Sequence, residues 1–599
     1  MTWDFKRFME EIDFLGRLLS SRMDDIESSL DLSPLVRRLD EEAARRKLLE
    51  FFGPGVVQAL GVDGSMSYED RMEIVVLYIA VSGFRVPLEI AGNGELRARF
   101  EEMRREEKYT FSTVIPIWIE DLNEIVSARE VGVTRSLEAV MESVPFALMT
   151  FGEYYMGLRG LRGDVDVLIL DRPLASSIHP YRRDARKLLF DEGGGRLAGL
   201  RVDGERVSAA DIFLAVYAGP FVGGRPLFPM PYRGRFRIPA IVQFIVERGG
   251  YADVHEIRLR FGIGDAEWRR ALRKLTALDA SLGNELFVET AGPRLELRDE
   301  RMAYWERVRA LIDYVGRRLF SGSGGHPLYL GEGRWLSTRD VNTLTLLAIY
   351  EIARVEAERG KLVIGIGKDT YVTDLHRSVI PISAHLGLVK RGVKVPIKSD
   401  RPLLTLASSL RPDVFRTPWR FAGYDGAFAT LVENDEGPDD VPLKAARKVI
   451  YPEGLIVRSY FQLRSLRGAG GVEVKSPVFF YDRFQRPEDA AMRVEVKALE
   501  GRSEVTIRPY LEVVMSEIDN MILYMLSRMD NPEITEATGH NYLLFMADKD
   551  VKAAIAMVKE MVIGAADARI NEVIRGRRVF VVTRRFRDFR RLVEARRRR

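Results

Sequence analysis

Apolar and polar residues alternate along most of this 599-residue chain in the rhythm of strands followed by helices. Residues 73–82 form a nearly unbroken apolar run rich in Val and Ile, which is typical of a strand buried on both faces. Residues 127–149 repeat apolar positions with a helical period, and residues 166–171 form another buried strand. The same rhythm returns with a helix over 344–356 and a strand over 362–367. These patterns predict a mixed α/β core.

Other segments extend this core at both ends. Residues 1–52 show helical spacing of apolar residues, and they form either a brace on the core or a partner-binding arm. Further strands are expected over 428–433, 455–464, 478–483 and 505–507, and long helices over 510–529 and 551–563.

Residues 181–335 interrupt the α/β rhythm and are expected to be an insertion. Within it, a module at about 232–300 has the order of a winged helix. Three helices are predicted over 238–247, 254–261 and 265–278, followed by strands over 285–288 and 295–297. The third helix carries Arg269, Arg270, Arg273 and Lys274, as a DNA-recognition helix does, although winged helices also contact proteins.

The length of the chain exceeds what one hydrophobic core supports and predicts two to four domains. The expected segments are a helical region (1–52), a first part of the core (53–180), the insertion (181–335), a second part of the core (336–583) and a basic tail (584–599). The tail ends in four arginines, and it is either solvated or in contact with nucleic acid.

Composition narrows the function classes only in part. The 91 basic and 87 acidic residues leave a net charge of +4, so a nucleic-acid surface has to arise from local clustering. The chain has no cysteine, which excludes disulfides, thiolate metal sites and cysteine nucleophiles. Abundant Arg and Glu without Cys fit a protein from a hot environment. No signal peptide or membrane-spanning run is apparent, so a cytoplasmic protein without membrane contact is expected.

The candidate chemistry lies in acidic residues where buried strands are expected to reach solvent. Asp63 follows the apolar residues 56–62, and Asp171 follows the strand at 166–170. Glu138 lies between them on a predicted helix. Carboxylates from separate elements are what a hard divalent cation requires, although a carboxylate at a strand end is also a common helix N-cap.

These motifs, in this order, resemble those of the archaeal NurA nucleases. The resemblance covers most of 50–180 and 345–565, but not the insertion. The matching pieces are Val62-Asp63-Gly64-Ser65, Arg135 to Glu138, Leu168 to Leu174, Gly365-Ile366-Gly367-Lys368-Asp369, Arg458 to Leu463 and Gly539 to Asp548.

The resemblance implies a ribonuclease H-like (Piwi-like) mixed-sheet fold. It also implies a metal-dependent DNA nuclease, a 5′-to-3′ exonuclease or single-strand endonuclease, that acts in DNA end resection during double-strand break repair. Family members are similar to one another in forming homodimers and in working with HerA, a hexameric ATP-driven DNA translocase. The implied metal is Mn²⁺, with Mg²⁺ as the second choice. The alternative is a catalytically weak DNA-end-binding or scaffold subunit of a translocase complex.

By this resemblance Asp63, Glu138 and Asp171 match the metal carboxylates. Asp548 stands where the family usually has a histidine, and an all-oxygen ligand set of this kind suits Mg²⁺ or Mn²⁺. Lys368 could hold the scissile phosphate, or it could form an ordinary ion pair. Tyr460 is expected either to orient DNA or to be a core aromatic residue. His540-Asn541 replaces a tyrosine-proline pair of the family, and His540 lies either near the site or on the surface. Arg172 replaces a glycine that is common in the family.

Overall fold

The structure is a computed structural model of the chain. It describes residues 5–71, 74–121, 125, 137–232, 234–289, 293–322, 325–331, 333–368, 371–391, 395, 397–426, 431–433, 443–445, 455–467, 473–500, 503–531 and 533–576. The basic tail at 584–599 lies outside these residues, as does the side chain of Glu138.

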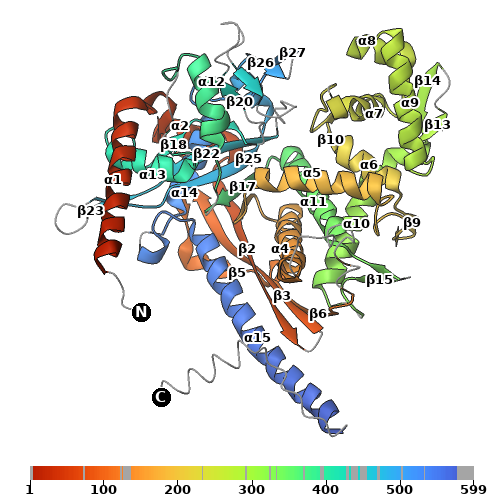
Figure 1. Cartoon of the computed structure of the whole chain (residues 1–599), viewed down its shortest axis with the longest axis horizontal. Coiled ribbons are helices and arrows are strands. Elements are labelled where there is room, and N and C mark those ends of the chain that lie inside the picture. The colour runs from red at the N-terminus through yellow and green to blue at the C-terminus, as the bar shows by residue number, and fades with distance from the viewer. Residues whose placement is uncertain are drawn as a thin grey trace.

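A 12-stranded mixed sheet organises the molecule (Figure 1). Its central strands β2, β7 and β17 run parallel to one another, whereas the other strand pairs are antiparallel. In spatial order the strands are β1 (Val36–Arg38), β18 (Trp419–Phe421), β22 (Ile456–Gln462), β25 (Phe479–Phe484), β17 (Leu362–Gly367), β7 (Val167–Leu170), β2 (Gly55–Arg71), β3 (Ile74–Ile90) and β4 (Leu96–Ala98). Strands β5 (Arg104–Arg105) and β6 (Phe111–Trp118) pair with β3, and β19 (Tyr424–Asp425) pairs with β22.

Helices cover both faces of this sheet. In β7, Leu168 and Leu170 belong to one hydrophobic cluster and Val167 and Ile169 to another, as expected for a strand buried on both sides. The first cluster is built with α4 (Leu137–Arg162), α5 (Leu174–Asp191) and α11 (Thr338–Arg359). The second is built with α2 (Glu41–Phe52), α14 (Glu517–Arg528) and α15 (Tyr542–Gly576).

A third cluster packs beside the outer strands β18 and β22. It includes residues of α12 (Ile380–His385) and α13 (Asp400–Leu410), and α1 (Phe5–Ser29) runs alongside α13. The remaining strands of this half form a small sheet of β20 (Leu431–Glu433), β21 (Leu443–Ala445), β26 (Val496–Glu500) and β27 (Ser503–Ile507), and a hairpin of β23 (Ser465–Arg467) and β24 (Glu473–Lys475).

The region 181–335 contains the helices and strands expected from its sequence, with additions. The three helices of the expected module are α7 (Arg237–Glu247), α8 (Val254–Phe261) and α9 (Asp265–Ser281). Strands β13 (Phe287–Glu289) and β14 (Arg294–Leu297) form the expected pair, and β12 (Tyr251–Asp253) adds a third strand on β14. The other elements are α6 (Ala209–Tyr217), α10 (Tyr304–Phe320), and the hairpins β8 (Arg201–Val202) with β9 (Glu205–Arg206), β10 (Phe221–Val222) with β11 (Arg225–Pro226), and β15 (Tyr329–Gly331) with β16 (Arg334–Trp335).

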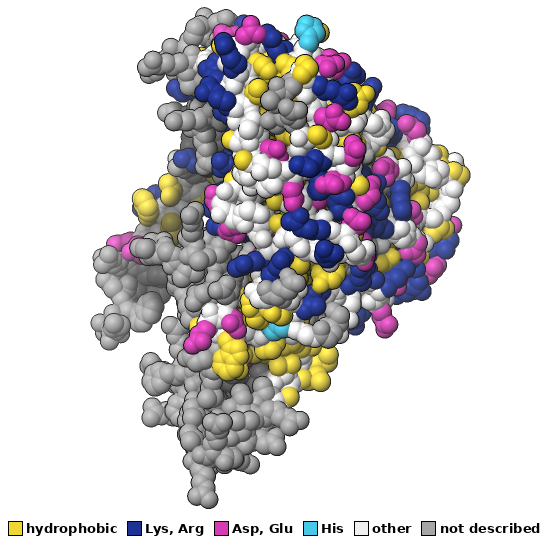
Figure 2. All heavy atoms as spheres, turned by 90° about the vertical axis from the view of Figure 1, so that its right-hand side faces the viewer, with side chains coloured by type: hydrophobic (Ala, Val, Ile, Leu, Met, Phe, Trp, Pro, Cys, Tyr) yellow, Lys and Arg dark blue, Asp and Glu magenta, His cyan; other side chains and the backbone are white. Residues whose placement is uncertain are grey.

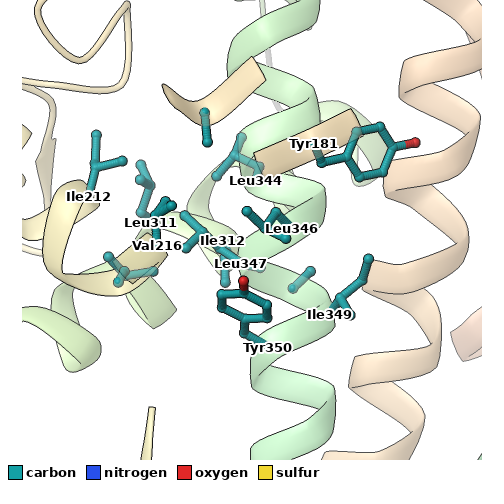
Figure 3. Close-up of a cluster of buried hydrophobic side chains, with 14 of the residues drawn as sticks. Tyr181, Ile212, Val216, Leu311, Ile312, Leu344, Leu346, Leu347, Ile349 and Tyr350 are labelled. Carbon is teal, nitrogen blue, oxygen red and sulfur yellow. The ribbon is translucent and has the colours of Figure 1, made fainter. Parts of the chain in front are cut away.

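This region shares its core with the sheet-covering helices. Figure 3 shows Ile212 and Val216 of α6 beside Leu311 and Ile312 of α10, facing Leu347 of α11. All five side chains are buried and belong to the same cluster as the central strand residues. The polypeptide between α5 and α11 is therefore anchored on the sheet-covering helices by apolar packing.

Several element boundaries differ from the sequence expectation. β2 was expected to reach solvent near Asp63, but β3 pairs with it along its full length, from Gly55↔Ile90 to Arg71↔Ile74. Asp63 consequently lies in the middle of a long strand. The helix expected to end at Met149 continues to Arg162, because residues 151–161 keep burying apolar side chains.

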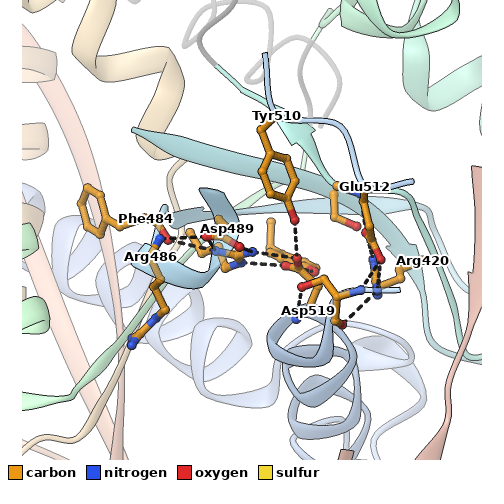
Figure 4. Close-up of polar contacts among 12 residues, drawn as sticks. Arg420, Phe484, Arg486, Asp489, Tyr510, Glu512 and Asp519 are labelled. Atoms are coloured by element: carbon orange, nitrogen blue, oxygen red, sulfur yellow. Dashed lines mark hydrogen bonds and ion pairs between the residues drawn. The ribbon is translucent and has the colours of Figure 1, made fainter. Parts of the chain in front are cut away.

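Buried ion pairs join β18 and β25 to α14 and to the segments that contain Asp489 and Glu512 (Figure 4). Arg420 binds both carboxylate oxygens of Glu512 at 2.5 and 2.6 Å. Arg483 binds Asp489 and Asp519 at 2.6–2.9 Å. Burial alone would raise the pKa of Asp519, but the Arg483 guanidinium overrides it and holds that pKa well below its ordinary value.

No helix within the described ranges combines the length and the apolar character needed to cross a membrane.

Candidate functional site

Three adjacent parallel strands bring Asp63, Asp171 and Lys368 to one edge of their shared ladder. In register, Val62 of β2 lies opposite Leu170 of β7, and Leu170 lies opposite Gly365 of β17. The backbone N–H of Asp171 then donates a hydrogen bond of 3.1 Å to the carbonyl oxygen of Val62. β7 and β17 end here, whereas β2 continues to Arg71, so Asp171 and Lys368 follow the carboxyl ends of their strands and lie beside Asp63 in the middle of β2.

Strand alternation puts the three side chains on the same face. Ile366 and Ile169 belong to the hydrophobic cluster on the α15 side of the sheet, and Lys368 and Asp171 each follow two residues later. Val62 belongs to the opposite cluster, so Asp63 also points to the α15 side. Lys368 forms an ion pair with Asp171 there.

Asp63 is the most perturbed acid of this group. Its side chain is 5% exposed and accepts a hydrogen bond of 2.8 Å from the N–H of Gly64. Burial raises its pKa well above the ordinary value, and the negative charges of Asp171 and Glu153 raise it further. Lys368 acts in the opposite direction without reversing the shift. Burial and the two neighbouring carboxylates therefore favour the protonated form of Asp63 when no cation is bound.

Glu153 is a site residue that sequence reasoning missed. It lies on α4, is 2% exposed, and binds Arg172 at 2.5 Å, in addition to its effect on Asp63. A Cβ at Gly64 would lie 2.6 Å from Glu153 Oε1, so the glycine of the first motif is required for this close approach. The available sequence signal was a lone carboxylate in the apolar stretch between Val144 and Leu158.

Arg172 stands where the resemblance predicts a glycine, and in the structure it pairs with the buried carboxylate of Glu153. Burial lowers the pKa of a guanidinium, but the Glu153 carboxylate more than compensates and holds the pKa of Arg172 above its usual value. Its guanidinium also lies 5.1 Å from the ring centre of Phe146. Arg172 therefore serves as the counter-ion of a buried carboxylate.

The loop before α15 places His540 near the same edge. Gly539 has φ +77°, and a Cβ there would lie 2.2 Å from Ser476 Cβ, so glycine is needed at this turn. Asn541 caps α15 by accepting from the N–H groups of Leu543 and Leu544 at 3.2 and 3.3 Å. Burial, helped by the charge of Lys368, lowers the pKa of His540 to about 4, so the imidazole is neutral at physiological pH. This location agrees with the alternative in which His540 reaches the site.

Asp548 lies on α15 and forms an ion pair with Lys552. Lys552, one helical turn later, contacts it at 2.8 Å. The pKa of Lys552 is raised chiefly by this hydrogen bond and also by Asp63 and Asp171, which shows that the pair lies within electrostatic range of the strand ends. Sequence reasoning did not identify Lys552.

The other predicted residues fall in different places. Glu138 is the second residue of α4, but its side chain lies outside the described residues. Tyr460 is 1% exposed, and its hydroxyl donates to Asp400 at 3.1 Å, which is the core position rather than a DNA-facing one. The four predicted cations, Arg269, Arg270, Arg273 and Lys274, are exposed on α9, which lies apart from β2, β7 and β17 (Figure 1).

Among the described residues, no group of three Asp, Glu or His side chains is arranged to hold a metal ion. Asp63 and Asp171 nevertheless fit two oxygen ligands of a hard divalent cation, since the mutual repulsion that raises the pKa of Asp63 is what such a cation relieves. A neutral His540 with a buried Nε2 that has no hydrogen-bond partner in the described structure could add a nitrogen ligand.

Comparisons with known proteins gave matches only among solved structures. No protein-family model and no curated protein matches the chain. The chain is similar to the crystal structure of the NurA nuclease from Sulfolobus solfataricus, at 11% identity and TM-score 0.35, with 96% of this chain and 98% of that chain covered. It is similar to NurA with manganese, at 13% identity, TM-score 0.34 and coverage of 93% and 98%. It is also similar to NurA bound to dAMP and manganese, at 13% identity, TM-score 0.28 and coverage of 81% and 87%.

Proposed function

We propose that this chain is a divalent-metal-dependent deoxyribonuclease of the NurA type. The observation that carries the proposal is the convergence of Asp63, Asp171 and Lys368 where the parallel strands β7 and β17 end beside the middle of β2. This convergence agrees with the order of motifs by which the sequence resembles that family. Carboxylates beside a fixed cation are the groups that phosphodiester hydrolysis uses.

Each side chain has a distinct role in this proposal. Asp63 and Asp171 would hold the ion, Mn²⁺ or Mg²⁺, with Glu138 and Asp548 as the further ligands that the resemblance implies. When bound, such an ion activates water and stabilises the leaving oxygen. Lys368, already at this edge, exchanges Asp171 for a phosphate oxygen of the substrate and neutralises its charge. Glu153, paired with Arg172, packs closely against Gly64 and so supports the part of β2 that carries Asp63.

The substrate in this proposal is DNA at or near an end, recognised mainly through phosphates. Binding should therefore depend weakly on sequence and strongly on salt. The winged-helix-like module would add contacts through the exposed cations of α9. A homodimer, a HerA-type ATPase partner and a role in end resection complete the proposal, and these rest on the sequence resemblance.

A second candidate is a DNA-end-binding or scaffold subunit with weak catalysis. The specific observation in its favour is that every acidic side chain described near the edge except Asp63 already has a cation: Lys368 pairs with Asp171, Arg172 with Glu153, and Lys552 with Asp548. A site neutralised in this way can persist as a structural core without metal.

Cleavage of end-labelled single- and double-stranded DNA, with Mn²⁺, Mg²⁺ or chelator, distinguishes the two. The nuclease proposal expects metal-dependent cleavage by the wild type that Asp63→Asn abolishes. Asp299→Asn is the matched control, because this exposed aspartate in the 299–303 turn lies outside the site. DNA binding without cleavage in any metal would favour the scaffold.

A further inference from the structure

A cavity of about 370 Å³ lies between α5, α6, α7 and α9, and no residue of the Asp63 site lines it. Its volume lies within the range of small-molecule sites in proteins. The lining divides into an aromatic part and a cationic part. The aromatic residues are Phe190, Phe213, Tyr217 and Phe236, and the cationic residues are Arg182, Arg183, Arg186, Arg235 and Lys274.

The aromatic part forms a connected surface. Phe213 packs against Tyr217 with ring centres 4.9 Å apart and against Phe190 at 6.4 Å, edge to face. Phe213 is buried, but Phe190 is 43% exposed, although it belongs to the same group. A large ring left open to solvent beside a cavity is available to stack on a ligand.

The cations converge on the same place from different elements. Burial raises the pKa of Tyr217, whereas Arg186, Arg182 and Arg235 all lower it, so three guanidinium groups lie near one hydroxyl. The Nε–H of Arg182 donates to the hydroxyl of Tyr350 at 2.6 Å, which fixes this buried arginine in the cavity wall. Arg186 and Arg235 are exposed and pair with no described carboxylate.

This charge pattern differs from that of the surrounding surface. Figure 2 shows Lys and Arg interspersed with Asp and Glu over the side of the molecule on which α6 to α9 lie. None of the described residues that line the cavity is acidic. Arg183 pairs with Asp184 at 3.8 Å, and the other cations around the aromatic surface give the cavity a net positive charge within a surface of mixed charge.

We infer that this cavity binds a nucleoside phosphate. An aromatic base would stack on Phe190 and Tyr217, and the phosphate would bind the guanidinium groups of Arg186 and Arg235, which match its oxygens in charge and geometry. A purely apolar ligand would make no use of the guanidinium groups of Arg186 and Arg235, and a simple anion would make no use of the aromatic rings.

The nucleoside phosphate could be a free nucleotide or the terminal nucleotide of a strand. The arrangement favours the strand end, a step that rests on the proposed function. On α9, Arg270 lies one turn from Lys274 and continues the cationic stripe out of the cavity. The helix α5 begins just after Asp171 and carries Arg186 at roughly 18 Å from its start, at 1.5 Å per residue. Because α5 connects them, the distance between the cavity and the Asp63 site is fixed by the length of this helix.

Binding is measured by titration calorimetry with full-length Asp63→Asn protein in chelator, so that cleavage and metal binding at the first site do not contribute. The probes are dAMP, inorganic phosphate, and one oligonucleotide with and without a 5′-phosphate. We expect dAMP to bind, and Arg186→Glu and Phe190→Ala each to weaken it by about tenfold or more. Arg201→Glu is the matched control, because this exposed arginine on β8 does not line the cavity.

Each outcome is decisive for the cavity alone. No binding of dAMP or of either oligonucleotide overturns the inference, as does an equal loss in Arg201→Glu. Phosphate binding as tightly as dAMP, with Phe190→Ala unchanged, would also overturn it, since the rings would then have no role.

A clear preference for the phosphorylated oligonucleotide over dAMP supports the strand end, and the reverse order supports the free nucleotide. Loss of cleavage in Asp63→Asn, measured separately, bears only on the nuclease proposal. Arg186 and Phe190 are exposed, and a thermal unfolding curve checks that each variant protein is folded.

Discussion

Lys368 forms an ion pair with Asp171 across the ends of two neighbouring parallel strands, β17 and β7. This contact joins the sequence motif around 365–368 to the one around 168–174 and places a fixed cation beside Asp63. Because Lys368 lowers the pKa of Asp63, the lysine influences both the charge of the site and the binding of a phosphate.

Replacing this lysine should reduce cleavage and shift its pH dependence. Lys368→Met removes a charge that lowers the pKa of Asp63, so that pKa rises and the acid limb of the cleavage profile moves to higher pH. We expect a loss in rate of about 10²- to 10³-fold, similar to the loss of one preorganised donor to a developing charge. The measurement is the cleavage rate against pH in Mn²⁺, with Lys368→Arg retaining most of the rate. An unshifted acid limb would show that Lys368 does not act on Asp63.

The raised pKa of Asp63 predicts a stability that falls as pH rises. An unfolded aspartate loses its proton near pH 4, whereas the folded one retains it to higher pH, so the unfolded state is favoured progressively above pH 4 until the folded group also ionises. Asp63→Asn should remove this slope and be more stable than the wild type at neutral pH. Urea unfolding from pH 5 to 9 in chelator measures it, with Asp299→Asn as the control. Parallel curves for the wild type and Asp63→Asn would contradict the prediction.

The glycine of the first motif should be required for packing, not only for its position in the motif. Gly64→Ala adds a Cβ 2.6 Å from Glu153 Oε1 and 2.9 Å from Met149 Cγ, and we expect it to destabilise the protein by about 1–3 kcal/mol. Gly16→Ala on α1 is the matched control, because nothing lies within 4 Å of its added Cβ, and alanine favours a helix there. Chemical denaturation compares the two variants. Equal stability of the two variants would show that the Glu153 side chain moves away from the added Cβ at little cost.

The buried pair Arg420–Glu512 should matter far more than a surface pair. Both side chains are 0% exposed, so Glu512→Gln leaves a buried guanidinium without its counter-ion and should cost about 3–5 kcal/mol. Glu495→Gln, which breaks the exposed pair with Arg508, should cost less than about 1 kcal/mol. Denaturant midpoints at neutral pH measure both. Similar losses would show that the interior around Arg420 is hydrated or relaxes.

Local patterns identified many of the elements in advance. The strands at 166–171 and 362–367, and the three helices between 237 and 281, appear close to their expected positions. Their apolar periodicity reflects burial by neighbouring layers, and such a signal is contained in a short window of sequence. Asp171 and Lys368 were recognisable for the same reason, because each directly follows an apolar strand.

What only the tertiary structure decided concerns pairing between distant segments. The extension of β2 to Arg71 depends on β3, and the buried hydroxyl of Tyr460 finds its hydrogen-bond partner in Asp400, 60 residues away in the chain. Glu153 gained its place in the site because α4 crosses under Gly64, and no local pattern encodes that crossing. Sequence by itself thus determined these strands and helices and the positions of Asp171 and Lys368 directly after apolar strands, since these follow from local periodicity, whereas the position of Asp63 in the middle of β2 depends on the pairing with β3. Which side chains meet, and with what pKa, was decided by the packing of elements that lie far apart in sequence.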